Sequence, residues 1–262
     1  MEDIFTFCLD RIKQDRAYHG KHFQSKLTSL ANAVSSQPFR TTPGQFLATV
    51  DENNRGETAF QRALYRSGEL SFVGSGRTSS LTWKDIELPI ILSTKSRRRC
   101  VDLIGQTRQH GTFLCEVKHA KEGAAVPGNA VDYAIFEALL YYAIIERDYV
   151  LLDEEKVYRP PKPPRFSWKA VRESRRVLVL ANDYFWAGAR QSQSRVRITN
   201  LAADVHDSLD VQMLLCSTPN YIFDRPEAVI AGRYEPQFVS APKEICAAAR
   251  IFPQYRTIVT LG

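Results

Sequence analysis

Three charged side chains stand inside two segments whose other residues are mostly apolar. Asp102 lies within residues 100–106, and Glu116 and Lys118 lie within residues 112–120. If both segments are strands, their period of two places Glu116 and Lys118 on one face. A charged group in a partly buried place costs several kcal/mol unless it is paired or holds an ion. The pattern therefore indicates a site rather than ordinary strand surface.

Two acids and a lysine that converge suit the metal-assisted hydrolysis of a phosphodiester. Two carboxylates can hold a hard cation such as Mg²⁺ while the ion keeps several waters. The ion polarises a phosphoryl oxygen and lowers the pKa of a bound water. Lys118 could orient or deprotonate that water, or stabilise the negative charge of the transition state. The sequence thus predicts Asp102 and Glu116 as ligands of Mg²⁺ or Mn²⁺, beside Lys118.

The elements that must position these residues follow from apolar periodicity and from glycine and proline. In chain order we expect helices at 3–35 and 57–67, strands at 80–93, 100–106 and 112–120, a helix at 129–146, a strand at 176–182, a helix at 201–215, and short strands at 228–231 and 257–261. The polar segment 107–111 ends in glycine, so it should join two of these strands as a hairpin. Pro89 favours a sheet edge for its strand.

The expected helix at 129–146 carries a single charge between Tyr133 and Ile145, namely Glu137. A helix this apolar should be covered on most of its sides. We interpret Glu137 as a satisfied polar position at the edge of the helix. An approach of Glu137 to the predicted site is the alternative.

Asp102, thirteen intervening residues and then Glu116-Val117-Lys118 resemble the PD-(D/E)xK nuclease superfamily. The expected order of elements is also similar to the core of that family over roughly residues 55–185: a helix, an edge strand, a strand with Asp, a strand with E-x-K, an apolar helix and a further strand. Val101 stands where many members have proline. The helix after the E-x-K strand lacks the Gln and Tyr pattern of the RecB-like exonuclease branch, which argues against that branch.

The resemblance implies an α/β protein with a restriction-endonuclease-like core, in which helices flank a mixed central sheet. It implies Mg²⁺-dependent (or Mn²⁺-dependent) cleavage of DNA, most simply by an endonuclease of restriction, repair or defence type. Asp102 and Glu116 would bind the metal, and Lys118 would assist the nucleophile. Glu57 on the preceding helix would support the site, with Glu69 as a weaker candidate. A homodimer is one option, because many such enzymes cut both strands as dimers.

Basic residues flank the predicted site, and the chain carries a formal net charge of +6. Arg97, Arg98 and Arg99 lead into the strand with Asp102, and Lys121 follows the E-x-K strand. Because lysine and arginine contacts to phosphates supply much of the affinity for nucleic acid, we expect these four residues to contact DNA. A solvated basic surface is the alternative.

We divide the chain into an N-terminal helical segment (1–54), a nuclease-like core (55–185) and a C-terminal extension packed on the core (186–262). The first residues place acids before an apolar stretch and differ from a secretory signal, so a cytoplasmic protein is expected. The sequence contains no run of about 18 apolar residues, so we expect no membrane-spanning helix. The five cysteines contain no C-x-x-C pair, which favours small buried hydrophobic residues over a zinc or disulfide framework.

Other classes of protein also fit this sequence. One is a module of the same fold that binds nucleic acid or a partner protein without cleavage. Another is an interaction protein of unrelated α/β fold, whose basic charge aids solubility. A surface hairpin with a solvated Glu–Lys pair would also explain the E-x-K residues. The tripeptide alone carries no weight, because a second copy, Glu154-Glu155-Lys156, stands in a charged segment before a proline-rich loop at 156–164.

Overall fold

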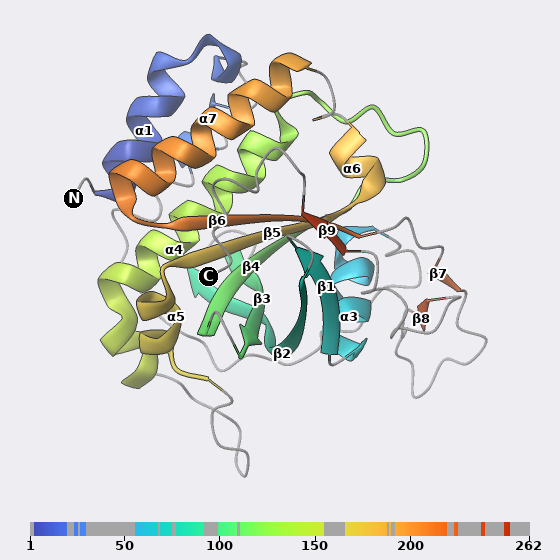
Figure 1. The fold of residues 1–262 in the computed structure, drawn as a ribbon. Coiled ribbons are helices and arrows are strands. Elements are labelled where there is room, and N and C mark those ends of the chain that lie inside the picture. The colour runs from blue at the N-terminus through green and yellow to red at the C-terminus, as the bar shows by residue number, and fades with distance from the viewer. Residues whose placement is uncertain are drawn as a thin grey trace.

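A computed structural model of the chain gives the arrangement of its helices and strands (Figure 1). The structure describes residues 3–19, 24–25, 27–29, 56–67, 69–74, 77–91, 99–108, 111–154, 166–187, 189, 192–218, 223–224, 237–238 and 249–251. Residues 36–55, the proline-rich loop at 156–164, the short strands predicted at 228–231 and 257–261, and Cys246 lie outside these residues.

A mixed β-sheet forms the centre of the protein. The strands run in the order β1-β2-β3-β4-β5-β6, antiparallel from β1 to β4 and parallel from β4 to β6. A short strand, β9, pairs with both β6 and β1, so the strand order closes on itself. The strands are β1 (Glu69–Gly74), β2 (Arg77–Ile91), β3 (Arg99–Thr107), β4 (Gly111–Lys118), β5 (Arg176–Asn182), β6 (Gln212–Thr218) and β9 (Ala249–Ile251), with a separate pair β7 (Phe223–Asp224) and β8 (Gln237–Phe238).

Helices flank this sheet on two sides (Figure 1). One side carries α1 (Ile4–Gln14), the 3-10 helix η1 (Arg16–Tyr18), α4 (Ala130–Glu154), α5 (Trp168–Ser174) and α7 (Ser192–Leu209), while α6 (Asp183–Ala187) follows β5. The other side carries α3 (Glu57–Ser67), which contacts β2, β3 and β4. The expected α/β class with a mixed sheet between helices is thereby confirmed. Among the described helices, none has both the length and the apolar content needed to span a bilayer.

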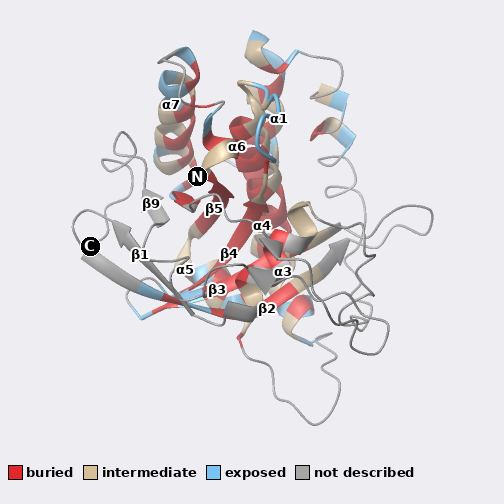
Figure 2. Cartoon of the chain, turned by 90° about the vertical axis from the view of Figure 1, so that its right-hand side faces the viewer, coloured by how far each residue is buried: buried red, intermediate tan, exposed pale blue. Residues whose placement is uncertain are grey.

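Side chains along the central strands alternate between two separate hydrophobic clusters. On β4, Leu114 joins the cluster under α1, α4 and α7, whereas Phe113, Cys115 and Val117 join the cluster under α3. Strands β5 and β6 alternate in the same way, and buried residues fill α4, β4 and β5 (Figure 2). Since successive side chains point to opposite faces, Glu116 and Lys118 share the α4 face with Leu114.

Several predicted elements are confirmed close to their expected bounds. The hairpin between β3 and β4 is present, with Thr107 paired to Gly111. Strand β5 has the predicted bounds, and α3 spans the predicted helix at 57–67. Helix α4 begins near the predicted start but continues to Glu154. Of the described cysteines, Cys8, Cys115 and Cys216 are buried and Cys100 is half-buried.

The predicted helix at 201–215 is wrong in its second half. Helix α7 ends at Leu209, and Asp210 takes a left-handed backbone conformation with φ of 53°. An Asp tolerates that conformation better than most residues, and it ends the helix. The apolar run that follows becomes β6, buried on both faces as parallel strands are. A short apolar run has the same composition in a buried helix and in a buried strand, so periodicity could not separate them.

The prediction that Pro89 marks an edge strand is wrong for β2 as a whole, since β2 lies between β1 and β3. As far as the described residues show, however, β1 pairs with β2 only up to Thr82. Pro89 therefore lies in the part of β2 that has β3 as its partner, and the register shifts between Pro89 and Ile91. Proline is tolerated there because no second ladder among the described strands requires its missing N–H.

Candidate active site

Asp102 lies on β3 at the point where the ladder to β4 stops. The last pair of that ladder joins Leu103 to Cys115. Beyond it, Oδ2 of Asp102 accepts a hydrogen bond of 2.8 Å from the backbone N–H of Val117. The carboxylate thus takes the place of a backbone acceptor, which fixes Asp102 against the end of β4.

A side chain of helix α3 also holds the main chain of Asp102 in place. Gln61, 5 % exposed, donates a hydrogen bond of 2.7 Å from Nε2 to the carbonyl oxygen of Asp102. Glu57 stands four residues earlier on the same helix, so both side chains lie on one face. Sequence reasoning missed Gln61, although its spacing from the predicted Glu57 could have identified it.

The ammonium of Lys118 lies among three carboxylates from three elements. Its Nζ is 2.6 Å from Oε1 of Glu116 on β4, 3.0 Å from Oε2 of Glu137 on α4, and 3.5 Å from Oε1 of Glu57 on α3. The Lys118 side chain is 13 % exposed, and that of Glu116 is 3 % exposed. These contacts differ from a solvated surface pair, because burial leaves the charges little screened by water.

Burial also dominates the electrostatics of the two strand acids. It raises the pKa of Asp102 to about 7, against the opposing effects of Lys118 and the Val117 N–H. Burial and the neighbouring Asp102 raise the pKa of Glu116 well above its ordinary value. Oε2 of Glu116 is buried and has no hydrogen-bond partner. Two close acids and an unpartnered carboxylate oxygen form a place that favours a cation.

Lys118 remains a cation in these surroundings. Burial alone would lower the pKa of Lys118, but Glu116, Glu137 and Glu57 together raise it well above its ordinary value. An ammonium held in this way is suited to stabilising negative charge. It is poorly suited to removing a proton from water, because a general base works best with a pKa near the ambient pH.

Glu137, interpreted above as a satisfied polar position at the helix edge, follows the alternative and approaches the predicted site. Its carboxylate reaches Lys118, and its side chain is 15 % exposed. Tyr141 lies one helical turn further on α4, and burial, Glu137 and Glu116 raise its pKa well above the ordinary value. Sequence reasoning missed Tyr141. Its spacing of four residues from Glu137 was the available signal.

Of the predicted site residues, Glu116, Lys118 and Glu57 come together through these contacts, with Glu137 in addition, and Asp102 bonds to the backbone of Val117 between Glu116 and Lys118. No family model, curated protein or solved structure matches the chain.

A divalent cation fits the two strand acids, although they form a small donor set. Within the described ranges, no group of three or more His, Cys, Asp or Glu side chains has an arrangement that could hold a metal ion. Mg²⁺, however, commonly binds through one or two carboxylates and keeps several waters. The unpartnered Oε2 of Glu116, beside Asp102, meets that requirement.

The basic residues predicted to contact nucleic acid are described only in part. Lys121 is exposed and follows β4 by three residues. Arg99 begins β3, and Arg97 and Arg98 lie outside the described residues, as does the side chain of Arg99. Glu69, the weaker candidate for a supporting acid, begins β1.

The chain segment that leaves the site is held by Asn182 at the end of β5. Its Oδ1 accepts a hydrogen bond of 3.0 Å from the N–H of Ala120, and its Nδ2 donates one of 2.8 Å to the carbonyl of Ala120. Asn182 is 2 % exposed. The Asn182 side chain thus bonds both backbone groups of Ala120, as a neighbouring strand would. Ala120 stands two residues after Lys118.

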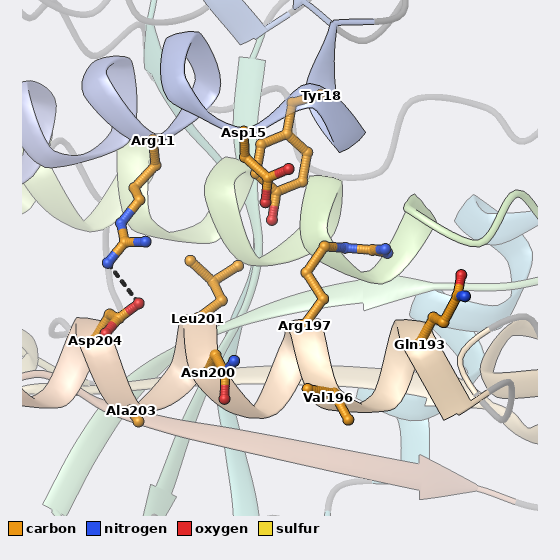
Figure 3. Close-up of a pocket in the computed structure, with 10 residues that line it drawn as sticks. All are labelled: Arg11, Asp15, Tyr18, Gln193, Val196, Arg197, Asn200, Leu201, Ala203 and Asp204. Atoms are coloured by element: carbon orange, nitrogen blue, oxygen red, sulfur yellow. Dashed lines mark hydrogen bonds and ion pairs between the residues drawn. The ribbon is translucent and has the colours of Figure 1, made fainter.

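A pocket of about 700 Å³ lies elsewhere, between α1, η1 and α7 (Figure 3). Its charged side chains are already engaged by neighbours. Arg11 pairs with Asp204 at 2.5 Å, and Arg197 pairs at 2.7 Å with Asp132, which is fully buried and also accepts a hydrogen bond from Tyr18. These pairs tie α1, η1, α4 and α7 together, so we assign the pocket a structural role.

Proposed function

We propose that this protein is a metal-dependent nuclease that hydrolyses DNA phosphodiester bonds, with endonucleolytic cleavage of restriction, repair or defence type. The observation that carries the proposal is that Asp102, Glu116 and Lys118 lie close together in a largely buried place, where Oε2 of Glu116 has no hydrogen-bond partner. A buried acceptor with no donor is costly, and a cation would satisfy it.

Each residue of the site has a distinct role in this proposal. Asp102 and Glu116 would hold Mg²⁺ or Mn²⁺. The ion would polarise a phosphoryl oxygen and lower the pKa of a bound water. Lys118, held as a cation, would stabilise the negative charge that develops on the phosphate oxygens. Glu57 and Glu137 would keep its ammonium in place.

The order of the elements supports a restriction-endonuclease-like core as part of the proposal. Helix α3, strands β1 to β4, helices α4 and α5, and strand β5 follow one another along the chain, an order similar to that of this core with β1 and α5 added. Asp102 and the E-x-K residues fall on the two adjacent strands of the hairpin. DNA as the substrate is supported by the net charge of +6 and by the exposed Lys121 near the site.

The test is a cleavage assay with supercoiled plasmid, linear duplex and single-stranded DNA in Mg²⁺ or Mn²⁺. We expect wild type to cut, and Asp102→Ala and Lys118→Ala to lower the rate by about 100-fold or more. Lys169→Ala is the matched control, because Lys169 is 62 % exposed and pairs only weakly with Glu173 at 3.7 Å. Equal cutting by wild type and both site variants would overturn the assignment.

A wild type that binds DNA without cutting would instead indicate the non-cleaving module. Its affinity should then fall steeply as salt rises, since phosphate contacts release counter-ions. Measuring binding at two salt concentrations alongside the cleavage assay separates these two functions.

A further inference from the structure

A single ammonium joins two carboxylates that come from different layers of the fold. Lys118 Nζ lies 2.6 Å from Glu116 on the sheet and 3.0 Å from Glu137 on α4. Glu116 and Lys118 stand two residues apart on one face of β4, so the strand itself keeps this pair in contact. Glu137 is the partner that another element supplies.

A divalent ion and the Lys118 ammonium would compete for Glu116. A bound Mg²⁺ sits about 2.0–2.1 Å from its carboxylate oxygens, and a second cation on the same carboxylate is repelled at that range. Three carboxylates, those of Glu116, Glu137 and Glu57, lie within 3.5 Å of one ammonium, and Asp102 is a fourth acid that interacts electrostatically with it. Because the acids outnumber the one ammonium, an ion can bind Glu116 while Lys118 keeps another acid as its partner.

We propose that Lys118 is the internal counter-ion of the metal-free site, and that Glu137 is the positioning residue that holds its ammonium once a divalent cation takes Glu116. This inference rests on the metal site of the proposed function. Glu137 suits the role better than Glu57, because it lies 3.0 Å rather than 3.5 Å from Nζ and is 15 % rather than 43 % exposed. Glu116 Oε2, which is buried and unpartnered, is the oxygen open to the incoming ion.

The proposal predicts opposite effects of two substitutions on metal affinity. Lys118→Met removes the competing charge, so the affinity for Mn²⁺ should rise. Glu137→Gln removes the acid that receives the ammonium, so the affinity should fall by about tenfold, within the range typical of coupled neighbours. Glu57→Gln is the matched comparison and should lower the affinity less, because Glu57 is more distant and more exposed.

A double-mutant cycle identifies how Glu137 acts. Isothermal titration calorimetry with Mn²⁺ would be run on wild type, Lys118→Met, Glu137→Gln and the double variant, after circular dichroism has confirmed that each is folded. If Glu137 acts through Lys118, the tenfold effect of Glu137→Gln should largely vanish once Lys118 is Met. Glu137→Asp, which keeps the charge, should retain most of the wild-type affinity. If Lys118→Met does not fold, Lys118→Gln replaces it in the cycle.

The outcomes separate this inference from the proposed function. An undiminished effect of Glu137→Gln in the Lys118→Met background would overturn the inference, even if the wild type cleaves DNA. Mn²⁺ binding with the expected coupling but no cleavage would support the inference and contradict the nuclease. The absence of Mn²⁺ binding in both wild type and Lys118→Met would overturn both.

Discussion

The carboxylate of Asp102 accepts a hydrogen bond of 2.8 Å from the backbone N–H of Val117, just past the last backbone pair between β3 and β4. This bond and the nearby Lys118 both favour the ionised carboxylate. Burial outweighs them and raises the pKa of Asp102 to about 7. Asp102 therefore titrates near neutral pH in the metal-free protein.

We expect the metal-free protein to become less stable as the pH rises from about 4 to about 8. In the unfolded chain Asp102 has its ordinary pKa of 3.8, so in this window the folded state binds more protons. Its contribution to stability is complete below the unfolded pKa and is lost as the pH rises through the folded pKa. Asp102→Asn should flatten this dependence, by at most about 1.4 kcal/mol per pH unit. Urea unfolding in EDTA at several pH values measures it, and equal slopes for both proteins would contradict the assignment.

Gln61→Leu should lower both stability and activity. It leaves the carbonyl of Asp102 without its donor, which costs about 1–2 kcal/mol of the free energy of unfolding. The substitution also removes a contact that holds the backbone of Asp102 in place. The cleavage rate should therefore fall by more than the loss of folded protein explains. Gln14→Leu, at an exposed position at the end of α1, is the control and should change neither quantity much. A Gln61→Leu protein with full stability would show that the bond does not contribute.

Gly105→Ala should destabilise the sheet strongly for so small a change. A Cβ at Gly105 would lie 2.7 Å from Leu81, 3.0 Å from Phe113 and 3.2 Å from Trp83, all within the cluster under α3. Overpacking of this kind costs about 1–3 kcal/mol. Gly56→Ala is the matched control, because nothing lies within 4 Å of the new Cβ. Thermal unfolding of the two variants would show whether the cluster is as tightly packed as these distances indicate.

Arg197→Met should cost about 3–5 kcal/mol of the free energy of unfolding, because it leaves the fully buried Asp132 without its cation. Tyr18→Phe removes one hydrogen bond to the same carboxylate and should cost about 1 kcal/mol. Urea unfolding gives both values. Lys169→Met, which breaks an exposed ion pair, should change stability little. If Arg197→Met lowered the free energy of unfolding as little as Lys169→Met does, Asp132 would have to be satisfied by other donors.

The strand positions of the site could be predicted because they depend on a local rule. Alternation along β4 alone places Glu116 and Lys118 on one face, and the structure places them in contact. The glycine at 111 marks the turn that brings Asp102 alongside. These features need no knowledge of distant parts of the chain.

The helical contributions could not be predicted in the same way. Helix α4 is apolar around most of its circumference, so its sequence does not say which side faces the sheet. The facing of Glu137 is decided by packing against β4 and α1. Strand β6 was missed for a similar reason. Its apolar run forms a strand because it pairs with β5, which lies in another part of the sequence.

The clasp between Asn182 and Ala120 has a consequence for the order in which the protein assembles. Its two hydrogen bonds join residues 62 positions apart, whereas the β3–β4 hairpin closes over a few residues. Contacts across long stretches of chain form late, because loop closure must precede them. During synthesis the β3–β4 hairpin leaves the ribosome before β5 does. The backbone just after Lys118 therefore becomes ordered only when Asn182 has formed its hydrogen bonds to Ala120. Recovery of metal binding during refolding should therefore lag behind the formation of the hairpin.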